Sequence, residues 1–69
     1  MNWVKEIETE ERAETNNAVY RIWSAFEGVY GSVSEKTEKR GVFILRHKAK
    51  YSSFYQAKND LEAIAKQKD

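Results

Sequence analysis

The clearest periodic pattern in the chain lies at its C-terminal end. Apolar residues recur there at helical spacing and share one face of a helix over residues 53–68. Ser53 begins this segment and Gln56 follows three residues later, which is the spacing of a capping box. The residues predicted to face the core are Phe54, Ala57, Leu61, Ile64 and Ala65. The pattern therefore predicts a C-terminal helix with a well-defined start.

Residues 42–51 alternate with a period of two, which is typical of a half-buried strand. One face carries Phe43, Leu45, His47, Ala49 and Tyr51, and the other carries Ile44, Arg46, Lys48 and Lys50. We expect the mainly apolar face to meet the C-terminal helix. The basic face then points outward.

The middle of the chain fits two structures. Its apolar residues fall on one face of a helix, but its β-branched and aromatic residue types favour strands. The pair Glu27-Gly28 divides the stretch into residues 18–26 and 29–35, as in a hairpin with glycine where φ is positive. A lone strand at 42–51 would also need neighbours to pair with. We therefore predict a hairpin.

Residues 2–15 are compatible with a short helix or with a further strand. Asn2 is a suitable helix cap, and the glutamate-rich sequence favours a helix, which we prefer. The alternation that permits a strand runs through Trp3, Lys5, Ile7 and Thr9. The predicted fold class is α+β, a small three-stranded antiparallel β-meander packed against a C-terminal helix over 53–68, with an N-terminal helix or extra strand. Residues 1–69 form one small domain in this prediction.

With an N-terminal helix, the order of helix, three strands and helix resembles the double-stranded RNA-binding domain. That family has a Lys-Lys-x-Ala-Lys pattern at the start of its last helix, and Ala57-Lys58 match the end of it. Phe54 and Tyr55 stand at the two lysine positions, and the histidine of the family's first strand loop has no counterpart. The resemblance implies a topology, without the side chains that would bind RNA.

Length and composition limit what holds the fold together. A chain of 69 residues buries only about 60% of the surface that its unfolded form exposes. It has no Cys and one His, which excludes a disulfide and a structural zinc site of the usual four-ligand kind. We expect no cofactor and no metal, and self-association as a homodimer remains open.

The N-terminal residues and the hydropathy of the chain predict its location in the cell. No apolar run approaches the roughly 18 residues that would span a bilayer. The chain opens with Trp3, Lys5 and several glutamates rather than with a basic and then apolar signal. We therefore expect a cytoplasmic protein that does not act at a membrane.

The residues that usually perform catalysis are scarce. His47 is the only imidazole, and it falls on the apolar face of its strand, where a histidine is more often structural than a general base. Ser53 is accounted for as a helix cap, and nothing in the spacing brings a serine and an acid to His47. The sequence predicts that the protein is not an enzyme.

Charge is divided along the chain, although the net charge is only +1. Residues 1–35 contain three basic and seven acidic residues, a net charge of −4. Residues 36–69 contain nine basic and four acidic residues, a net charge of +5. Cations that alternate along a strand lie about 7 Å apart, near the interval between successive phosphates. The candidate residues for binding a partner or a nucleic acid are Lys39, Arg40, Arg46, Lys48 and Lys50.

These observations predict a non-catalytic binding module. Its partner is expected to be another protein, as for the small modulators that phages and mobile elements encode, because aromatic and charged residues are abundant in so short a chain. The alternative is a nucleic-acid-binding protein that uses the basic strand face over 39–50, with Trp23 and Tyr55 as stacking partners. A self-assembling structural protein is the third hypothesis.

Overall fold

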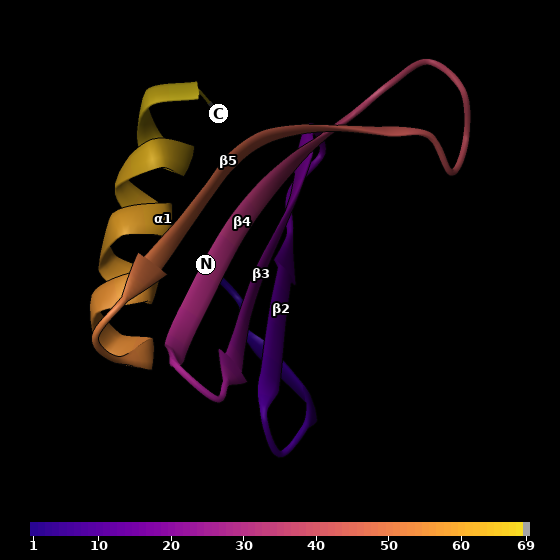
Figure 1. The fold of residues 1–69 in the computed structure, drawn as a ribbon. Helices are drawn as coiled ribbons and strands as arrows, with labels where there is room; N and C mark the ends of the chain where they lie inside the picture. The colour runs from indigo at the N-terminus through magenta and orange to yellow at the C-terminus, as the bar shows by residue number, and fades with distance from the viewer. Residues whose placement is uncertain (69) are drawn as a thin grey trace.

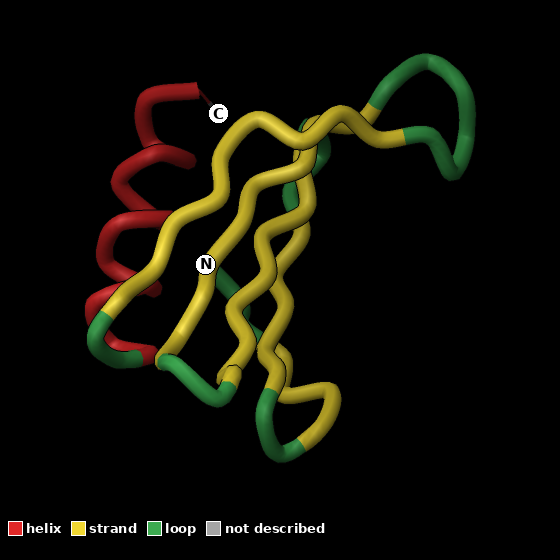
Figure 2. The backbone as a smooth tube through the Cα atoms, in the orientation of Figure 1, coloured by secondary structure: helices red, strands yellow, loops and turns green. Residues whose placement is uncertain are grey.

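The computed structural model describes residues 1–68 and shows a five-stranded sheet followed by one helix (Figure 1). The sheet is antiparallel throughout, and each strand pairs with the next one in the sequence. Its strands are β1 (Val4–Ile7), β2 (Glu10–Glu14), β3 (Ala18–Ala25), β4 (Gly28–Lys36) and β5 (Phe43–Tyr51). Helix α1 (Phe54–Lys68) packs on one side of the sheet, as Figure 2 also shows. The fold is therefore α+β.

The start of α1 is fixed by its cap. The backbone N–H of Gln56 donates to Ser53 Oγ at 3.1 Å, as the sequence predicts. The Gln56 side chain accepts from the backbone N–H of Ser52 at 2.8 Å, so the second bond reaches one residue further back than a capping box requires. Within residues 1–68 no helix has the length and apolar character needed to cross a membrane.

The core lies between α1 and β3 to β5. The predicted inner face of the helix is confirmed, because Ala57, Leu61 and Ala65 are buried and Phe54 and Ile64 pack against the same cluster. On the sheet, Tyr20 and Ile22 are almost fully buried. Gly31 allows the helix to come close, because a Cβ there would lie 3.2 Å from Leu61 Cδ1 and 3.0 Å from the Tyr51 ring.

The preference for a helix over residues 2–15 is wrong. This segment forms β1 and β2, so the sheet has five strands rather than three. The glutamates that favour a helix are held in β2 by cations from other elements, including Lys58 of α1, which lies 2.9 Å from Glu11. The two N-terminal strands also remove the likeness to the double-stranded RNA-binding domain, which depended on an N-terminal helix.

The hairpin predicted in the middle of the chain is confirmed, with its turn one residue earlier. Ala25 pairs with Gly28, so the two-residue loop is Phe26-Glu27 rather than Glu27-Gly28. Gly28 has the positive φ of +146° that a side chain would resist, at the first position of β4. This register pairs Trp23 with Tyr30.

The predicted two faces of residues 42–51 are correct only for the second half of β5. Val33 pairs with His47 and Ser34 with Leu45, so Arg46 is an extra residue in a β-bulge. A bulge reverses the alternation, and Phe43 and Leu45 therefore project to the same side as Lys48, away from the helix. They are 48% and 59% exposed instead of buried.

Candidate functional site

The side of the sheet opposite α1 is uncovered by any other element of residues 1–68 (Figure 1). Cross-strand partners project to the same side of a sheet, so the register identifies the side chains found there. Trp23 pairs with Tyr30, Tyr30 with Lys50, and Ser32 with Lys48. We call this side the open face, and its centre consists of Arg21, Trp23, Tyr30, Ser32, Lys48 and Lys50.

Two aromatic rings form a platform at the centre of the open face. The Trp23 and Tyr30 rings are stacked, with centroids 5.9 Å apart and an angle of 22° between their planes. The Lys48 Nζ atom lies 5.8 Å from the Trp23 centroid and 5.9 Å from the Tyr30 centroid. Arg21 lies 5.6 Å from the Trp23 centroid. These are cation–π distances, so the platform combines aromatic surface with positive charge.

The Tyr30 hydroxyl keeps its proton at neutral pH. It donates a hydrogen bond to Glu27 Oε2 at 3.2 Å. Partial burial raises the pKa of Tyr30 above its ordinary value, and the hydrogen bond to Glu27 and the charge of that carboxylate raise it further. The platform therefore presents an uncharged ring beside its cations.

Carboxylates of β2 neutralise some of the cations on the open face. Arg21 is bonded to Glu10, and Lys36 Nζ lies 2.5 Å from Glu14, which also binds Arg12 at 3.1 Å. The hydrogen bond and charge of Lys36 lower the pKa of Glu14, and Arg12 adds to the effect. This half of the open face is close to neutral.

The other half retains free positive charge. In the part of the chain that the structure describes, Lys39, Arg40 and Lys50 form no ion pair, and the Lys48 ammonium contacts the two rings. Lys39 and Arg40 lie in the exposed loop between β4 and β5, which extends beyond the other hairpins (Figure 1). Basic charge thus follows the β4–β5 hairpin.

All five predicted residues lie on this hairpin, but the structure turns one of them away from the open face. Lys48 and Lys50 share the open face as predicted, and Lys39 and Arg40 lie at the hairpin end. The regular row of three cations is wrong for Arg46, because the bulge turns this residue toward Glu35, whose Oε1 lies 2.7 Å from its guanidinium. Tyr55 lies on α1 and is therefore not part of the open face.

Sequence reasoning missed Tyr30 as a member of the platform. A turn at Glu27-Gly28 would pair Trp23 with Ser32, whereas the observed turn pairs it with Tyr30. The available signal was the equal distance of the two aromatic residues from the Phe26-Glu27 loop. The platform can therefore be predicted from the sequence only if the turn is placed at Phe26-Glu27.

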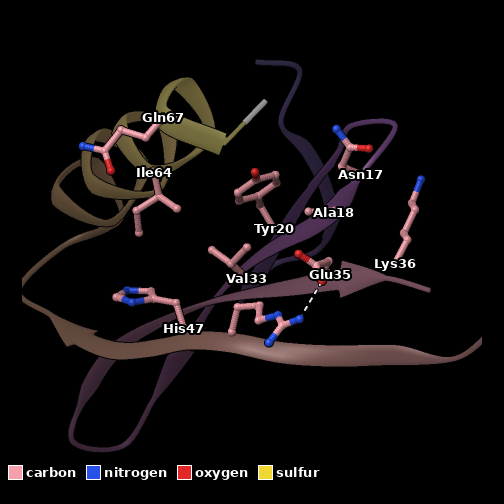
Figure 3. Close-up of a pocket in the computed structure, with 10 residues that line it drawn as sticks. Asn17, Ala18, Tyr20, Val33, Glu35, Lys36, His47, Ile64 and Gln67 are labelled. Carbon is pink, nitrogen blue, oxygen red and sulfur yellow. Dashed lines mark hydrogen bonds and ion pairs between the residues drawn. The ribbon is translucent and has the colours of Figure 1, made fainter.

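A pocket of about 400 Å³ lies on the opposite side of the sheet, beside α1. Tyr20 of β3, His47 of β5 and Ile64 of α1 border it (Figure 3). Its charged lining includes Lys36 and the ion pair of Arg46 and Glu35, which is drawn as a dashed line in Figure 3. The lining contains no serine or cysteine side chain.

His47 belongs to a hydrogen-bonded chain that joins β5 to α1. The Tyr51 hydroxyl donates its proton to Asp60 Oδ2, so it must accept from His47 Nε2, which lies 2.9 Å away. His47 is partly buried, as expected for a structural histidine. Its Nε2 is therefore occupied as a donor.

Residues 1–68 contain no group of three His, Cys, Asp or Glu side chains that could hold a metal ion. Comparison with known proteins found no matching family model, no matching curated protein and no matching solved structure. The open face is accordingly interpreted from its own chemistry.

Proposed function

We propose that the protein binds single-stranded nucleic acid on the open face of its sheet. The observation that carries this proposal is the stacked pair of Trp23 and Tyr30 with the Lys48 ammonium within 6 Å of both ring centroids. Aromatic surface stacks with bases, and adjacent cations contact phosphates, which is the combination that single strands need.

A single strand fits this surface better than a duplex does. The platform lies on the surface of a sheet, where the rings of Trp23 and Tyr30 are partly exposed. Neither ring stands on a helix that could enter the major groove of a duplex. Bases in a duplex are already stacked on each other, whereas those of a single strand are free to stack on a ring, a contact worth about 1–3 kcal/mol per base. RNA and DNA share this chemistry.

The free cations suggest a path for the backbone. Lys50 is the cross-strand partner of Tyr30, and Lys48 is the partner of Ser32 on the same face. Lys39 and Arg40 continue the positive charge at the end of the β4–β5 hairpin. A strand that runs from the platform along this hairpin would meet cations beside the rings and again at the β4–β5 loop, and its affinity would fall with added salt.

The test is a fluorescence-anisotropy titration of labelled single-stranded DNA, single-stranded RNA and duplex with the protein at two salt concentrations. We expect saturable binding of single strands that weakens as salt rises, and weaker binding of the duplex. Trp23→Leu keeps an apolar side chain but removes the aromatic ring, and it should weaken binding about 5- to 150-fold. Lys50→Ala should reduce the salt slope by about 0.7.

Two controls make this result specific. Lys66→Ala removes a cation from the exposed side of α1, away from the open face, and should leave affinity and salt slope unchanged. Circular dichroism of each variant shows that the fold is kept. No binding even at the lowest salt, or equal binding by Trp23→Leu and the unmodified protein, would overturn the proposal.

The second candidate is the protein-binding module that the composition predicts. One observation favours it: the four consecutive large apolar residues Val42, Phe43, Ile44 and Leu45 are between 42% and 59% exposed. An exposed apolar strand at the edge of a sheet is a typical site for adding a strand from another chain. Loss of partner capture by Leu45→Glu, with nucleic-acid binding unchanged, would support this function.

A further inference from the structure

The first half of β5 is uncovered on both faces and along its edge. β5 is the last strand of the sheet, so one side of its backbone has no strand partner within residues 1–68. Phe43 and Leu45 project to the open face and Ile44 to the opposite side, and they are 48%, 59% and 42% exposed. Helix α1 lies beside the other half of the strand (Figure 1). The first half therefore offers apolar surface to an added strand on both of its faces.

The backbone of this half has hydrogen-bonding groups that point away from the sheet. The Val42 carbonyl accepts from the backbone N–H of Thr37 at 3.2 Å, so Val42 directs its backbone groups into the β4–β5 hairpin. Successive residues of a strand direct these groups to alternate sides. Phe43 and Leu45 therefore direct theirs outward, and the bulge at Arg46 interrupts the alternation. A short, regular ladder can form along this half of the edge.

Beyond the bulge the edge strand is positively charged. β5 contains three basic and no acidic residues. Arg46 is paired with Glu35, whereas Lys48 and Lys50 form no ion pair within residues 1–68. The β4 residues opposite these two lysines are a serine and a tyrosine, so neither lysine has a carboxylate as its direct cross-strand neighbour. The edge is thus apolar in its first half and carries unneutralised positive charge in its second half.

We propose that the β5 edge binds an extended acidic segment of another protein, which adds to the sheet as a further strand. This inference rests on the second candidate function and makes its partner specific. The apolar side chains of the segment pack against Phe43 to Leu45, and its carboxylates lie opposite Lys48 and Lys50. Charge disfavours a second copy of this chain, because two β5 edges would repel each other and β1 carries only one lysine and one glutamate.

The arrangement of β5 also predicts the order of residues in the partner. Every neighbouring pair of strands in this sheet is antiparallel, and antiparallel pairing is slightly more stable per residue than parallel pairing. An antiparallel partner meets Lys50 and Lys48 first and the apolar residues afterwards. Its acidic residues therefore precede its apolar ones, over about eight residues, with a spacing of two between the carboxylates.

The test is a fluorescence-anisotropy titration of three labelled peptides with blocked ends. The first has the sequence Glu-Thr-Glu-Thr-Thr-Val-Ile-Val, the second has the same residues in reverse order, and the third has lysine in place of both glutamates. We expect saturable binding of the first peptide that weakens with added salt. The lysine peptide should bind about tenfold more weakly or worse, because two attractive cross-strand pairs become repulsive. The reversed peptide should also bind more weakly.

Variants assign the binding to the β5 edge. Leu45→Glu replaces an exposed apolar side chain by a carboxylate and should weaken binding of the first peptide about tenfold or more, with the fold checked by circular dichroism. Ala63→Glu adds the same charge on the exposed side of α1 and should leave peptide binding unchanged. Trp23→Leu, which is expected to weaken nucleic-acid binding, should leave it unchanged as well.

The possible failures separate this inference from the function on which it rests. If the lysine peptide or the reversed peptide binds as well as the first, and Leu45→Glu weakens that binding, the edge accepts strands and only the acidic, antiparallel partner is overturned. If none of the three peptides binds, the protein-binding role of the β5 edge is overturned with it. Binding of the first peptide that Leu45→Glu does not weaken places the peptide elsewhere and also overturns the proposal.

Discussion

The side chain of Tyr51 links β5 to α1. Its hydroxyl lies between His47 of the same strand and Asp60 of the helix, donating to the carboxylate and accepting from the ring. Its ring occupies the space that the missing side chain of Gly31 leaves. Burial raises the pKa of Tyr51 well above its ordinary value of 10.0, and the hydrogen bond to Asp60 and the charge of that group raise it further.

This shift predicts a loss of stability at alkaline pH. The folded state holds the phenol proton more tightly than the unfolded state, so the stabilisation is fully present below the ordinary pKa of 10.0 and is lost as pH rises above it. We expect Tyr51→Phe to flatten the decline of the free energy of unfolding above this pH. Urea unfolding at a series of pH values measures the decline. Tyr55→Phe, at a 77% exposed position, is the control and should decline as steeply as the unmodified protein.

Among the elements, α1 and the β3–β4 hairpin could be predicted because their signals are local. The Ser53 cap and the apolar spacing identify the helix, and the residue types on both sides of a glycine identify the hairpin. Strand β2 could not be predicted, because its glutamates are paired with residues distant in sequence, such as Lys36 and Lys58. The charges that hold a strand in place are not visible in its own periodicity.

The side chains of the open face could also be predicted only in part from the sequence. Lys48 and Lys50 were predicted on an outward face because two-residue alternation is a local property. The displacement of Arg46 and the exposure of Leu45 follow from the bulge, which depends on how β5 pairs with β4. A run of alternating residues carries no sign of an inserted one. Register therefore had to come from the three-dimensional structure.

The helix–sheet contact predicts the effect of a charge in the core. Leu61 is fully buried and lies over Gly31, so Leu61→Asp would bury a carboxylate without a partner, at a cost of several kcal/mol. A core of this size supplies only about 3–5 kcal/mol, and the variant should be unfolded by circular dichroism. Ala63→Asp, on the exposed side of the same helix, should melt close to the unmodified protein. A cooperative melt of Leu61→Asp would show that this face of α1 is not the core face.

Across the whole molecule, side chains tie the N-terminal strands to the helix that ends the described structure. The helix packs on β3, β4 and β5, whereas its connection to the N-terminal strands is made by the Lys58–Glu11 pair and by Trp3. Trp3 Nε1 donates to Glu62 Oε2 at 2.8 Å, between residues 59 positions apart. The N-terminal strands are thus tied to the helix by few side-chain contacts.

This arrangement predicts that β1 can be loosened without unfolding the rest of the sheet. Trp3→Phe keeps an aromatic ring in the partly buried position but removes the hydrogen bond to a charged acceptor, which should cost about 1.5–3 kcal/mol locally. Hydrogen exchange should become faster for the amides of β1 that pair with β2, with little change in β3 and β4. Glu62→Gln retains an oxygen that can accept from Trp3 and should give a smaller effect. Unchanged exchange in β1 would show that Trp3 does not hold this edge strand.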